Sequence, residues 1–259
     1  MLGRLKSLFT STGNNRVELP FSAELAPEQA FYAVGDVHGC LVAVEQVFAQ
    51  IDAHRVANGL NTAPIVLLGD FVDRGEDSAS VLERFKALNE AAPDRVYCLM
   101  GNHEKMMLDF LDDPAECGGR WLRFGGVQTL ASYGIKGVDE NSDAVDLMEA
   151  CDALENALPP GMEAWIRQLP MKWQSGNVYC VHAAMDPNRT VTHQSSRVLL
   201  WGHPDFFKTQ RDDGVWIVHG HTIVDVARAS GGRISIDTGA YKTGRLSVAV
   251  VTKGNCDFL

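Results

Sequence analysis

Short runs of apolar residues recur along the chain, and five of them end beside a residue type that binds metals. Each run is four or five residues long, the length of a buried strand. The runs cover residues 31–34, 65–68, 96–100, 178–181 and 215–218. Because open α/β sheets build their sites at the carboxyl ends of their strands, the polar residues after each run are candidate site residues.

Between these runs, apolar residues recur at helical spacing. Apolar positions between residues 41 and 51 predict a helix after the first run, and those between 81 and 88 predict another after the second. Strands alternating with helices predict a largely parallel sheet with right-handed crossovers. Beyond residue 221 the pattern is richer in strands, with apolar runs at 234–236 and 246–251.

Residues 105–170 interrupt this alternation. They begin with an apolar helical face, pass through a glycine-rich segment, and continue as an acidic helical stretch over residues 142–157. We expect a mainly helical cap that is inserted into a single domain of residues 1–259. A tail of residues 1–30 precedes the first predicted strand.

Composition narrows the class of protein. The formal charge of -10 argues against a nucleic-acid partner, which would need clustered Lys and Arg. The six cysteines are scattered without a CxxC pair, which is typical of a reducing compartment, and we expect a cytoplasmic protein.

No apolar run approaches the length of about 20 residues that a membrane span needs, so no stable membrane insertion is expected. Residues 1–10 lack a signal-peptide core and predict a frayed or packed terminus, with a weak amphipathic membrane contact as the alternative. The oligomeric state stays open.

The polar residues after the five runs form a set of metal-ligand types. Two carboxylates, one amide and three imidazoles are available: Asp36, His38, Asp70, Asn102, His182 and His221. A catalytic zinc ion uses only three protein ligands, whereas two divalent ions about 3.5 to 4 Å apart share one carboxylate. The mixture of imidazole and oxygen favours manganese, iron or zinc over magnesium or calcium. Two such ions with two carboxylates leave a net positive charge, which attracts phosphate to an acidic protein.

A second group of residues fits proton transfer and phosphate binding. His103 directly follows Asn102, so it is expected to face the substrate and to protonate the leaving oxygen. Asp73 is expected to hydrogen-bond His103 and to raise its pKa. Arg74 offers a planar guanidinium that matches phosphoryl oxygens.

The ordered motifs GDVHG, GDFVDRG, GNHE, His-Ala, GHT and IDTGA lie between residues 31 and 250. Together they resemble the phosphoprotein phosphatase (serine/threonine phosphatase) branch of the calcineurin-like metallophosphoesterases, and its bacterial members in particular. The resemblance implies an α/β fold, a four-layer α/β/β/α sandwich. It also implies a dinuclear centre between the two sheets, usually supported by manganese.

The resemblance further divides the predicted ligands between two metal ions. The first ion is assigned Asp36, His38 and Asp70. The second ion is assigned Asp70, Asn102, His182 and His221, so that Asp70 bridges. The resemblance also implies that His103 is the general acid, that Asp73 is its partner, and that Arg74 binds phosphate.

Four residues are candidate substrate contacts: Arg74, Asn102, His203 and Tyr241. Two positions depart from the bacterial pattern. His203 stands where these members carry the arginine of a Trp-x-Arg motif, which puts one phosphate contact in doubt. Phe124 stands where they carry an asparagine before Gly-Gly, on the side of the leaving group. Tyr241 is equally compatible with ordinary packing.

The leading hypothesis is a metal-dependent phosphomonoesterase that acts on phosphoserine or phosphothreonine in proteins. Hydrolysis would proceed by attack of a hydroxide that bridges the two metal ions. The alternative is a symmetrical dinucleoside polyphosphate (diadenosine tetraphosphate) hydrolase, whose relatives share the core motifs. Residues 121–134 look more like the protein-phosphatase branch, which favours the first hypothesis. A binding protein that keeps the fold without catalysis is a third possibility, which the complete ligand set opposes.

Overall fold

The computed structural model describes residues 21–259, and in this part of the chain ten strands form two five-stranded sheets. The first sheet has the order β10-β9-β1-β2-β3. Its strands are β1 (Phe31–Val34), β2 (Ile65–Leu67), β3 (Val96–Cys98), β9 (Val248–Thr252) and β10 (Asn255–Phe258). The second sheet has the order β4-β5-β6-β8-β7. Its strands are β4 (Lys172–Ser175), β5 (Val178–Val181), β6 (Trp216–His219), β7 (Arg228–Ser230) and β8 (Arg233–Ser235).

The helices confirm the two that the apolar spacing predicts after the first two runs, α1 (Leu41–Asn58) and α2 (Ser78–Ala91). The remaining helical elements are α3 (Asn102–Asp112), α4 (Pro114–Trp121), the π-helical turn η1 (Leu122–Gly126), α5 (Val127–Ser132), α6 (Ala144–Ala157), α7 (Met162–Arg167), α8 (Ser196–Trp201) and α9 (Ala240–Thr243). The predictions about residues 1–10 lie outside the described residues.

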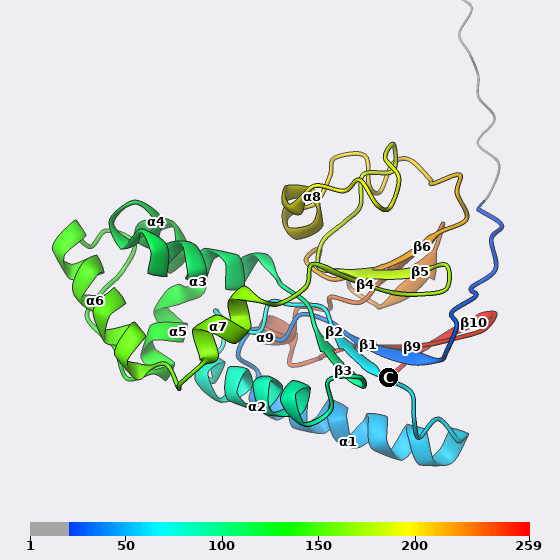
Figure 1. The fold of residues 1–259 in the computed structure, drawn as a ribbon, viewed down its shortest axis with the longest axis horizontal. Coiled ribbons are helices and arrows are strands. Elements are labelled where there is room, and N and C mark those ends of the chain that lie inside the picture. The colour runs from blue at the N-terminus through cyan, green and yellow to red at the C-terminus, as the bar shows by residue number, and fades with distance from the viewer. Residues whose placement is uncertain (1–20) are drawn as a thin grey trace, which may run out of the picture.

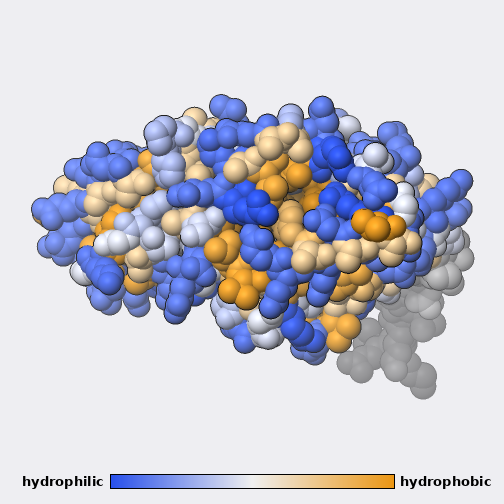
Figure 2. Space-filling view, turned by 90° about the horizontal axis from the view of Figure 1, so that it is seen from below, coloured by the Kyte–Doolittle hydropathy of each residue, from blue (hydrophilic) through white to orange (hydrophobic). Residues whose placement is uncertain are grey.

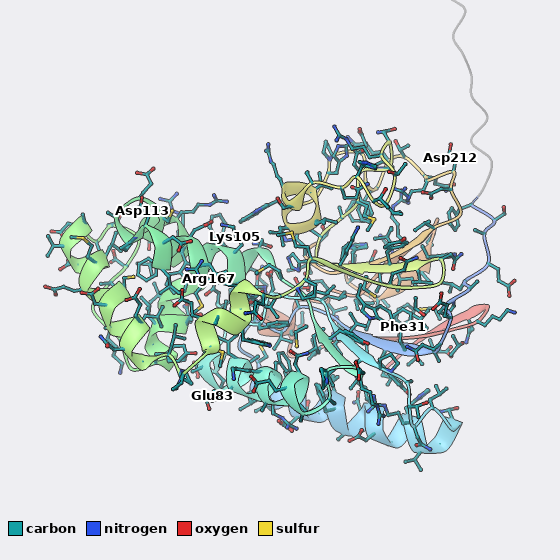
Figure 3. The ribbon with its side chains drawn as sticks, viewed as in Figure 1. Phe31, Glu83, Lys105, Asp113, Arg167 and Asp212 are labelled. Carbon is teal, nitrogen blue, oxygen red and sulfur yellow. The ribbon has the colours of Figure 1, made fainter. Side chains whose placement is uncertain are left out.

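The two sheets pack face to face, as the predicted sandwich requires (Figure 1). Phe31 and Ala33 of β1 point into the core between the sheets, and Phe31 is labelled there in Figure 3. The alternate residues Tyr32 and Val34 point the other way, against the α1 and α2 layer. β1 is therefore buried on both faces, which explains its uninterrupted apolar run. The outer face of the second sheet is covered by α8 and loops. The fold class is confirmed.

The strand directions differ from the prediction of a largely parallel sheet. Of eight strand pairings, four are parallel and four are antiparallel. Each sheet has a parallel centre, β1-β2-β3 or β5-β6-β8, to which antiparallel strands are added. The strands β4, β7 and β10 escaped prediction because they lie at sheet edges and are largely exposed, so they carry no apolar run.

The helices α3 to α7 gather at one end of the sandwich (Figure 1). The buried side chains of Phe110, Trp121 and Leu147 belong to the same apolar cluster as the α1 and α2 layer. Arg167 of α7 binds Asp112 at the end of α3, with guanidinium-to-carboxylate distances of 2.6 and 3.2 Å. The cap thus extends the helical layer of the first sheet and shares its core.

Residues 21–30, which were expected to belong to the tail, lie against the open end of the sandwich. The Trp216 indole N–H donates to the carbonyl of Ala23 (2.8 Å), and the Ala26 N–H donates to the side chain of Asn177 (2.8 Å). The backbone N–H of Gly254 donates to the carbonyl of Leu25 (2.8 Å). This segment therefore links the two sheets before β1 begins.

Helix length and exposed apolar side chains are the two features of the structure that concern membrane contact. Within residues 21–259, no helix combines the length and apolar character that a bilayer span requires. The face that carries α1, seen in Figure 2, mixes hydrophilic side chains with several separate groups of hydrophobic ones. Val42 and Val56 of α1 are among the exposed apolar residues.

Candidate active site

The backbone is strained at the predicted site. Among the described residues, five that are not glycine have a positive φ, between 45° and 73°: His38, Asp70, Asp73, Arg74 and His221. Every one of them is a predicted site residue. Because this conformation costs about 1–2 kcal/mol for a residue with a Cβ, surrounding contacts must hold it in place. The loops after β1, β2 and β6 are therefore built to aim particular side chains.

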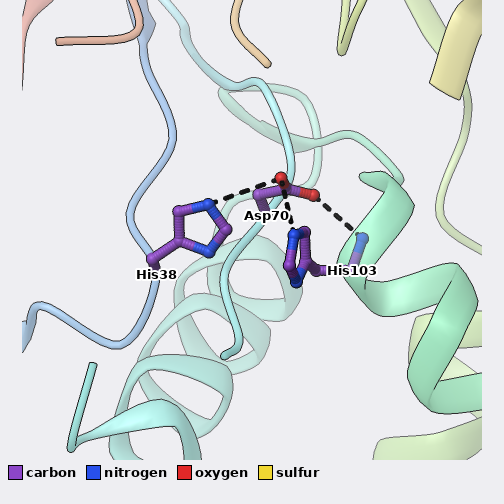
Figure 4. A group of neighbouring side chains, drawn as sticks. All are labelled: His38, Asp70 and His103. Carbon is purple, nitrogen blue, oxygen red and sulfur yellow. Dashed lines mark hydrogen bonds and ion pairs between the residues drawn. The ribbon is translucent and has the colours of Figure 1, made fainter. Parts of the chain in front are cut away.

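Asp70 lies between two histidines, and we call Asp70, His38 and His103 the first cluster (Figure 4). The Oδ2 atom of Asp70 is 3.6 Å from His38 Nε2 and 3.9 Å from His103 Nε2. Its Oδ1 atom accepts the backbone N–H of His103 (3.0 Å). His38 Nδ1 donates to the carbonyl of Val72 (2.9 Å), so its Nε2 lone pair faces the carboxylate. Two electron-rich atoms facing each other suit a cation between them.

Asp70 also belongs to a second cluster, which consists of Asp70, His182 and His221. His182 Nδ1 donates to the carbonyl of Leu68 (2.9 Å), which leaves Nε2 as an acceptor. That Nε2 atom lies 3.3 Å from Asp70 Oδ1 and 2.8 Å from Asn102 Oδ1. The four ligands predicted for the second ion therefore converge, again with lone pairs directed at one another.

The histidines carry the protonation state that ligands need. Burial lowers the pKa of His38 to about 3 and that of His221 to about 4. Burial also lowers the pKa of His182, although Asp70 opposes the shift. All three rings are therefore neutral near pH 7, with a nitrogen lone pair free to bind a metal.

Asp36 is fully buried and sits beside other carboxylates. Its Oδ2 atom accepts the backbone N–H of His221 (2.9 Å), whereas Oδ1 has no hydrogen-bond partner among the described residues. Burial chiefly, and then the charges of Asp237 and Asp70, raise the pKa of this carboxyl well above its ordinary value. Asp36 Oδ1 is buried, accepts no hydrogen bond from a described residue, and belongs to a group of three carboxylates with Asp70 and Asp237. Such an oxygen is suited to bind a cation. The donor set of the site thus fits two divalent ions.

The predicted proton-transfer pair is formed. His103 Nδ1 lies 2.6 Å from Asp73 Oδ2, and His103 Nε2 lies 3.1 Å from Arg74 Nη2. Burial lowers the pKa of His103, but the carboxylates of Asp70 and Asp73 outweigh it, so the net pKa lies above 6.5. The Arg74 guanidinium stacks 4.7 Å from the ring centre of Tyr241. Tyr241 therefore lies at the site, against Arg74.

Glu104 secures the loop that carries Asp70. Its buried carboxylate accepts four backbone N–H groups, those of Asp70 (2.8 Å), Phe71 (2.6 Å), Val72 (3.2 Å) and Gly101 (2.9 Å). The sequence carried a weak signal for this role, because a Glu at the third position of a helix can accept the N–H of the residue that caps it, here Gly101. Glu104 joins the starts of two site loops.

Two further residues of the site were missed. Trp121 donates its indole N–H to both oxygens of Asp73 (3.1 and 3.0 Å), and Thr129 donates its hydroxyl to Oδ1 (2.7 Å). Both side chains are buried and come from the cap. The only signal in the sequence was the resemblance of residues 121–134 to a family segment, which singles out no residue.

His203 and Phe124, the two residues that depart from the family pattern, have the following surroundings. His203 Nε2 is 3.7 Å from Asp186 Oδ2, and its Nδ1 accepts the backbone N–H of Asp205 (3.2 Å). Within the described part of the chain, these contacts join His203 to no predicted site residue. Phe124 is 45% exposed.

Two packed sheets with buried carboxylates and imidazoles at their strand ends define a metal-dependent phosphoesterase. The chain belongs to the calcineurin-like phosphoesterase family, whose model matches residues 30–251.

Within this family, the chain is similar to several named proteins. The bis(5'-nucleosyl)-tetraphosphatase PrpE [asymmetrical] of Oceanobacillus iheyensis is 26% identical over 83% of this chain and 85% of its own length. A symmetrical bis(5'-nucleosyl)-tetraphosphatase of Acidovorax sp. (strain JS42) is 29% identical over 62% of this chain, but the match spans only 46% of that enzyme. A solved structure of a candidate diadenosine tetraphosphatase superimposes with a TM-score of 0.60 at 20% identity. It covers 92% of this chain and 98% of its own. That structure supports the fold.

Proposed function

We propose that this chain hydrolyses phosphate bonds with the help of two divalent metal ions. The first ion would be held by Asp36, His38 and Asp70. The second ion would be held by Asp70, Asn102, His182 and His221. When bound, the ions would supply Lewis acidity toward phosphoryl oxygens and lower the pKa of the attacking water. The imidazole and oxygen ligands favour manganese, with iron or zinc as alternatives.

The first ion is assigned Asp36 in preference to His103. Both ring nitrogens of His103 already face partners, Asp73 at 2.6 Å and Arg74 at 3.1 Å. Asp36 instead has an oxygen without a partner. In these contacts His103 Nδ1–H donates to Asp73 and Nε2 accepts from Arg74. A leaving oxygen that displaces Arg74 Nη2 would face Nε2 and would take its proton from there once the ring is doubly protonated.

Arg74 would bind the phosphoryl group. Its guanidinium lies between the Tyr241 ring, 4.7 Å away, and His103 Nε2, 3.1 Å away. Stacking on a ring restricts a long side chain, so its planar donors are oriented before the substrate arrives. Arg74 would thus hold the phosphoryl group next to the residue that protonates the leaving oxygen.

We further propose that the substrate is a dinucleoside tetraphosphate. The similarity to PrpE extends along 83% of the chain and supports this substrate over a phosphoprotein. The phosphoprotein hypothesis is supported by the motifs of the wider family and by the resemblance of the shorter segment 121–134. The sequence alone favoured a phosphoprotein substrate, so this proposal reverses the order of the two hypotheses. PrpE is named an asymmetrical enzyme, and asymmetrical cleavage of diadenosine tetraphosphate yields ATP and AMP.

A competition experiment tests the substrate. The manganese-loaded protein is given diadenosine tetraphosphate and a phosphothreonine peptide, and kcat/KM is measured for each. We expect the larger kcat/KM for the dinucleotide, with ATP and AMP as products. As a control, turnover by the Asp70→Asn variant should be lower by on the order of 10³-fold or more. Two ADP molecules would instead indicate symmetrical cleavage. A larger kcat/KM for the peptide would restore the protein phosphatase hypothesis. The cytoplasmic location stays a prediction.

A further inference from the structure

The carboxylate of Asp73 is surrounded by donors from three residues, two of which belong to the cap. His103 Nδ1 is bound at 2.6 Å, the Thr129 hydroxyl at 2.7 Å, and the Trp121 indole N–H at 3.0 and 3.1 Å. Asp73 itself has no exposed surface. Because solvent contributes nothing to its orientation, these protein donors alone decide where the carboxylate points.

The backbone around Asp73 depends on the same segment. The Asp73 N–H donates to the hydroxyls of Thr129 (2.9 Å) and Ser78 (3.0 Å), and the Arg74 N–H donates to the carbonyl of Gly125 (3.3 Å). Asp73 and Arg74 have φ values of 73° and 70°. These contacts offset a conformation that is unfavourable for residues with a side chain.

Close approach of the cap is a requirement of this arrangement. A Cβ placed on Gly125 would lie 2.7 Å from the backbone nitrogen of Arg74 and 3.1 Å from the Cβ of Asp73. Gly125 also has a φ of 117°, which L side chains rarely adopt. The cap backbone can therefore touch the strained loop only with glycine at this position.

We propose that Trp121 and Thr129 are positioning residues that hold the Asp73 carboxylate against His103, so that the cap forms part of the catalytic machinery. Thr129 is the more direct of the two, because its hydroxyl donates to the side chain of Asp73 and accepts from its backbone. The inference rests on the proposed hydrolytic function. Partners that orient a functional side chain from behind typically contribute about 10–100-fold.

Kinetics with two leaving groups separate positioning from simple cap stability. Thr129→Val keeps the size of the side chain and removes its hydrogen bonds, whereas Thr129→Ser retains the hydroxyl. With phenyl phosphate, whose leaving group needs a proton, we expect Thr129→Val to lower kcat by about 10–100-fold with little change in KM. With p-nitrophenyl phosphate, whose leaving group needs little help, the loss should be smaller. Thr129→Ser should restore most of the activity.

A spectroscopic measurement makes the test independent of substrate. In the zinc-loaded protein, the proton on His103 Nδ1 should give a far-downfield NMR resonance, because it lies in a short bond to Asp73. His103→Asn assigns this resonance by removing it. We expect the signal to be lost or broadened in Thr129→Val and kept in Thr129→Ser. Trp121→Phe, which removes the N–H donor together with part of the buried indole, should weaken it as well and serves if Thr129→Val fails to fold.

The outcomes are distinct from those of the substrate experiment. If Thr129→Val and Trp121→Phe keep the resonance and the kcat of the unmodified protein, the positioning role is wrong even where dinucleotide hydrolysis is found. An equal loss with both aryl phosphates, with the resonance intact, would also overturn it and would leave the cap a structural role. A lost resonance supports positioning even if the dinucleotide is not the substrate.

Discussion

The two clusters that share Asp70 are built in different ways. The second cluster takes His182 and His221 from loops after β5 and β6 of the second sheet. The first cluster takes His38 from the loop after β1 and His103 from the first turn of α3, which follows β3 of the first sheet. Hydrogen bonds connect the first cluster to the cap, from His103 to Asp73 and from Asp73 to Thr129. The second cluster has a looser connection through aromatic contacts, because Arg120 of the cap lies over the Trp201 ring and Trp201 faces His221.

The two clusters also differ in the group that orients the imidazole rings of their histidines. His182 donates to the main-chain carbonyl of Leu68, which lies at the end of β2. His103 is held by the side chain of Asp73, which is itself held by residues from the cap. The second cluster therefore depends on the sheets, whereas the first depends on an insertion. We expect the second to tolerate changes in the cap and the first to respond to them.

Asp70→Asn should have the largest effect, because it alters both clusters at once. The substitution keeps the size of the side chain but removes the negative charge next to His38, His103 and His182. We expect the hydrolysis rate to fall by on the order of 10³-fold or more. Bound metal, measured by mass spectrometry, should fall below two ions per chain. Two tightly bound ions with normal turnover would show that Asp70 bridges nothing.

His103→Asn should have the next largest effect, and it separates the two roles available to this residue. As a proton donor, His103 contributes about 10²–10⁴-fold to kcat, and its loss leaves the metal content unchanged. As a ligand within the first cluster, its loss would remove an ion. We therefore expect a large fall in kcat with two ions still bound. One ion per chain would instead place His103 in the coordination shell in the position assigned to Asp36.

The convergence of most candidate ligands was predictable from the sequence, because each follows a strand that is buried on both faces. Such strands give continuous apolar runs, and the motif after each run fixes the position of the ligand. His182 and His221 converge on Asp70 for this reason. The edge strands β4 and β7 lacked such a run and were missed, as was the equal share of antiparallel pairings.

The rest of the site depends on contacts that local pattern does not encode. The positive φ of Asp73 arises where the cap docks on the loop, and Thr129, which binds it, is 56 residues away. The orientation of His203 toward Asp186 likewise depends on how neighbouring loops pack. Positions of this kind follow from tertiary structure, so a motif indicates the candidate ligands but not the residues that contact them from behind.

Gly220→Ala tests, with a smaller change, the contact between Asp36, assigned to the first ion, and the backbone of His221, assigned to the second. A Cβ at this position would lie 1.9 Å from Asp36 Oδ1, next to the backbone that positions His221. We expect weaker metal binding and a loss of activity of about 10–100-fold, as for other residues that orient ligands. Gly119→Ala in the cap, where the nearest neighbouring atom is 3.1 Å away, is the matched control. Equal metal affinity in the two variants would contradict the assignment of Asp36.

Tyr241→Leu should have the smallest effect and acts on the substrate side of the first cluster. The ring supports the Arg74 guanidinium at 4.7 Å and packs 5.2 Å from the ring of His38. Loss of a cation–π contact of about 0.5–1 kcal/mol should raise KM roughly two- to fivefold, with kcat and metal content preserved. Tyr241→Phe keeps the ring and should behave like the unmodified protein. If Tyr241→Leu instead releases a metal ion, the Tyr241 ring serves to orient His38. The first cluster would then depend on side-chain packing at His38 as well as on the bond between His103 and Asp73.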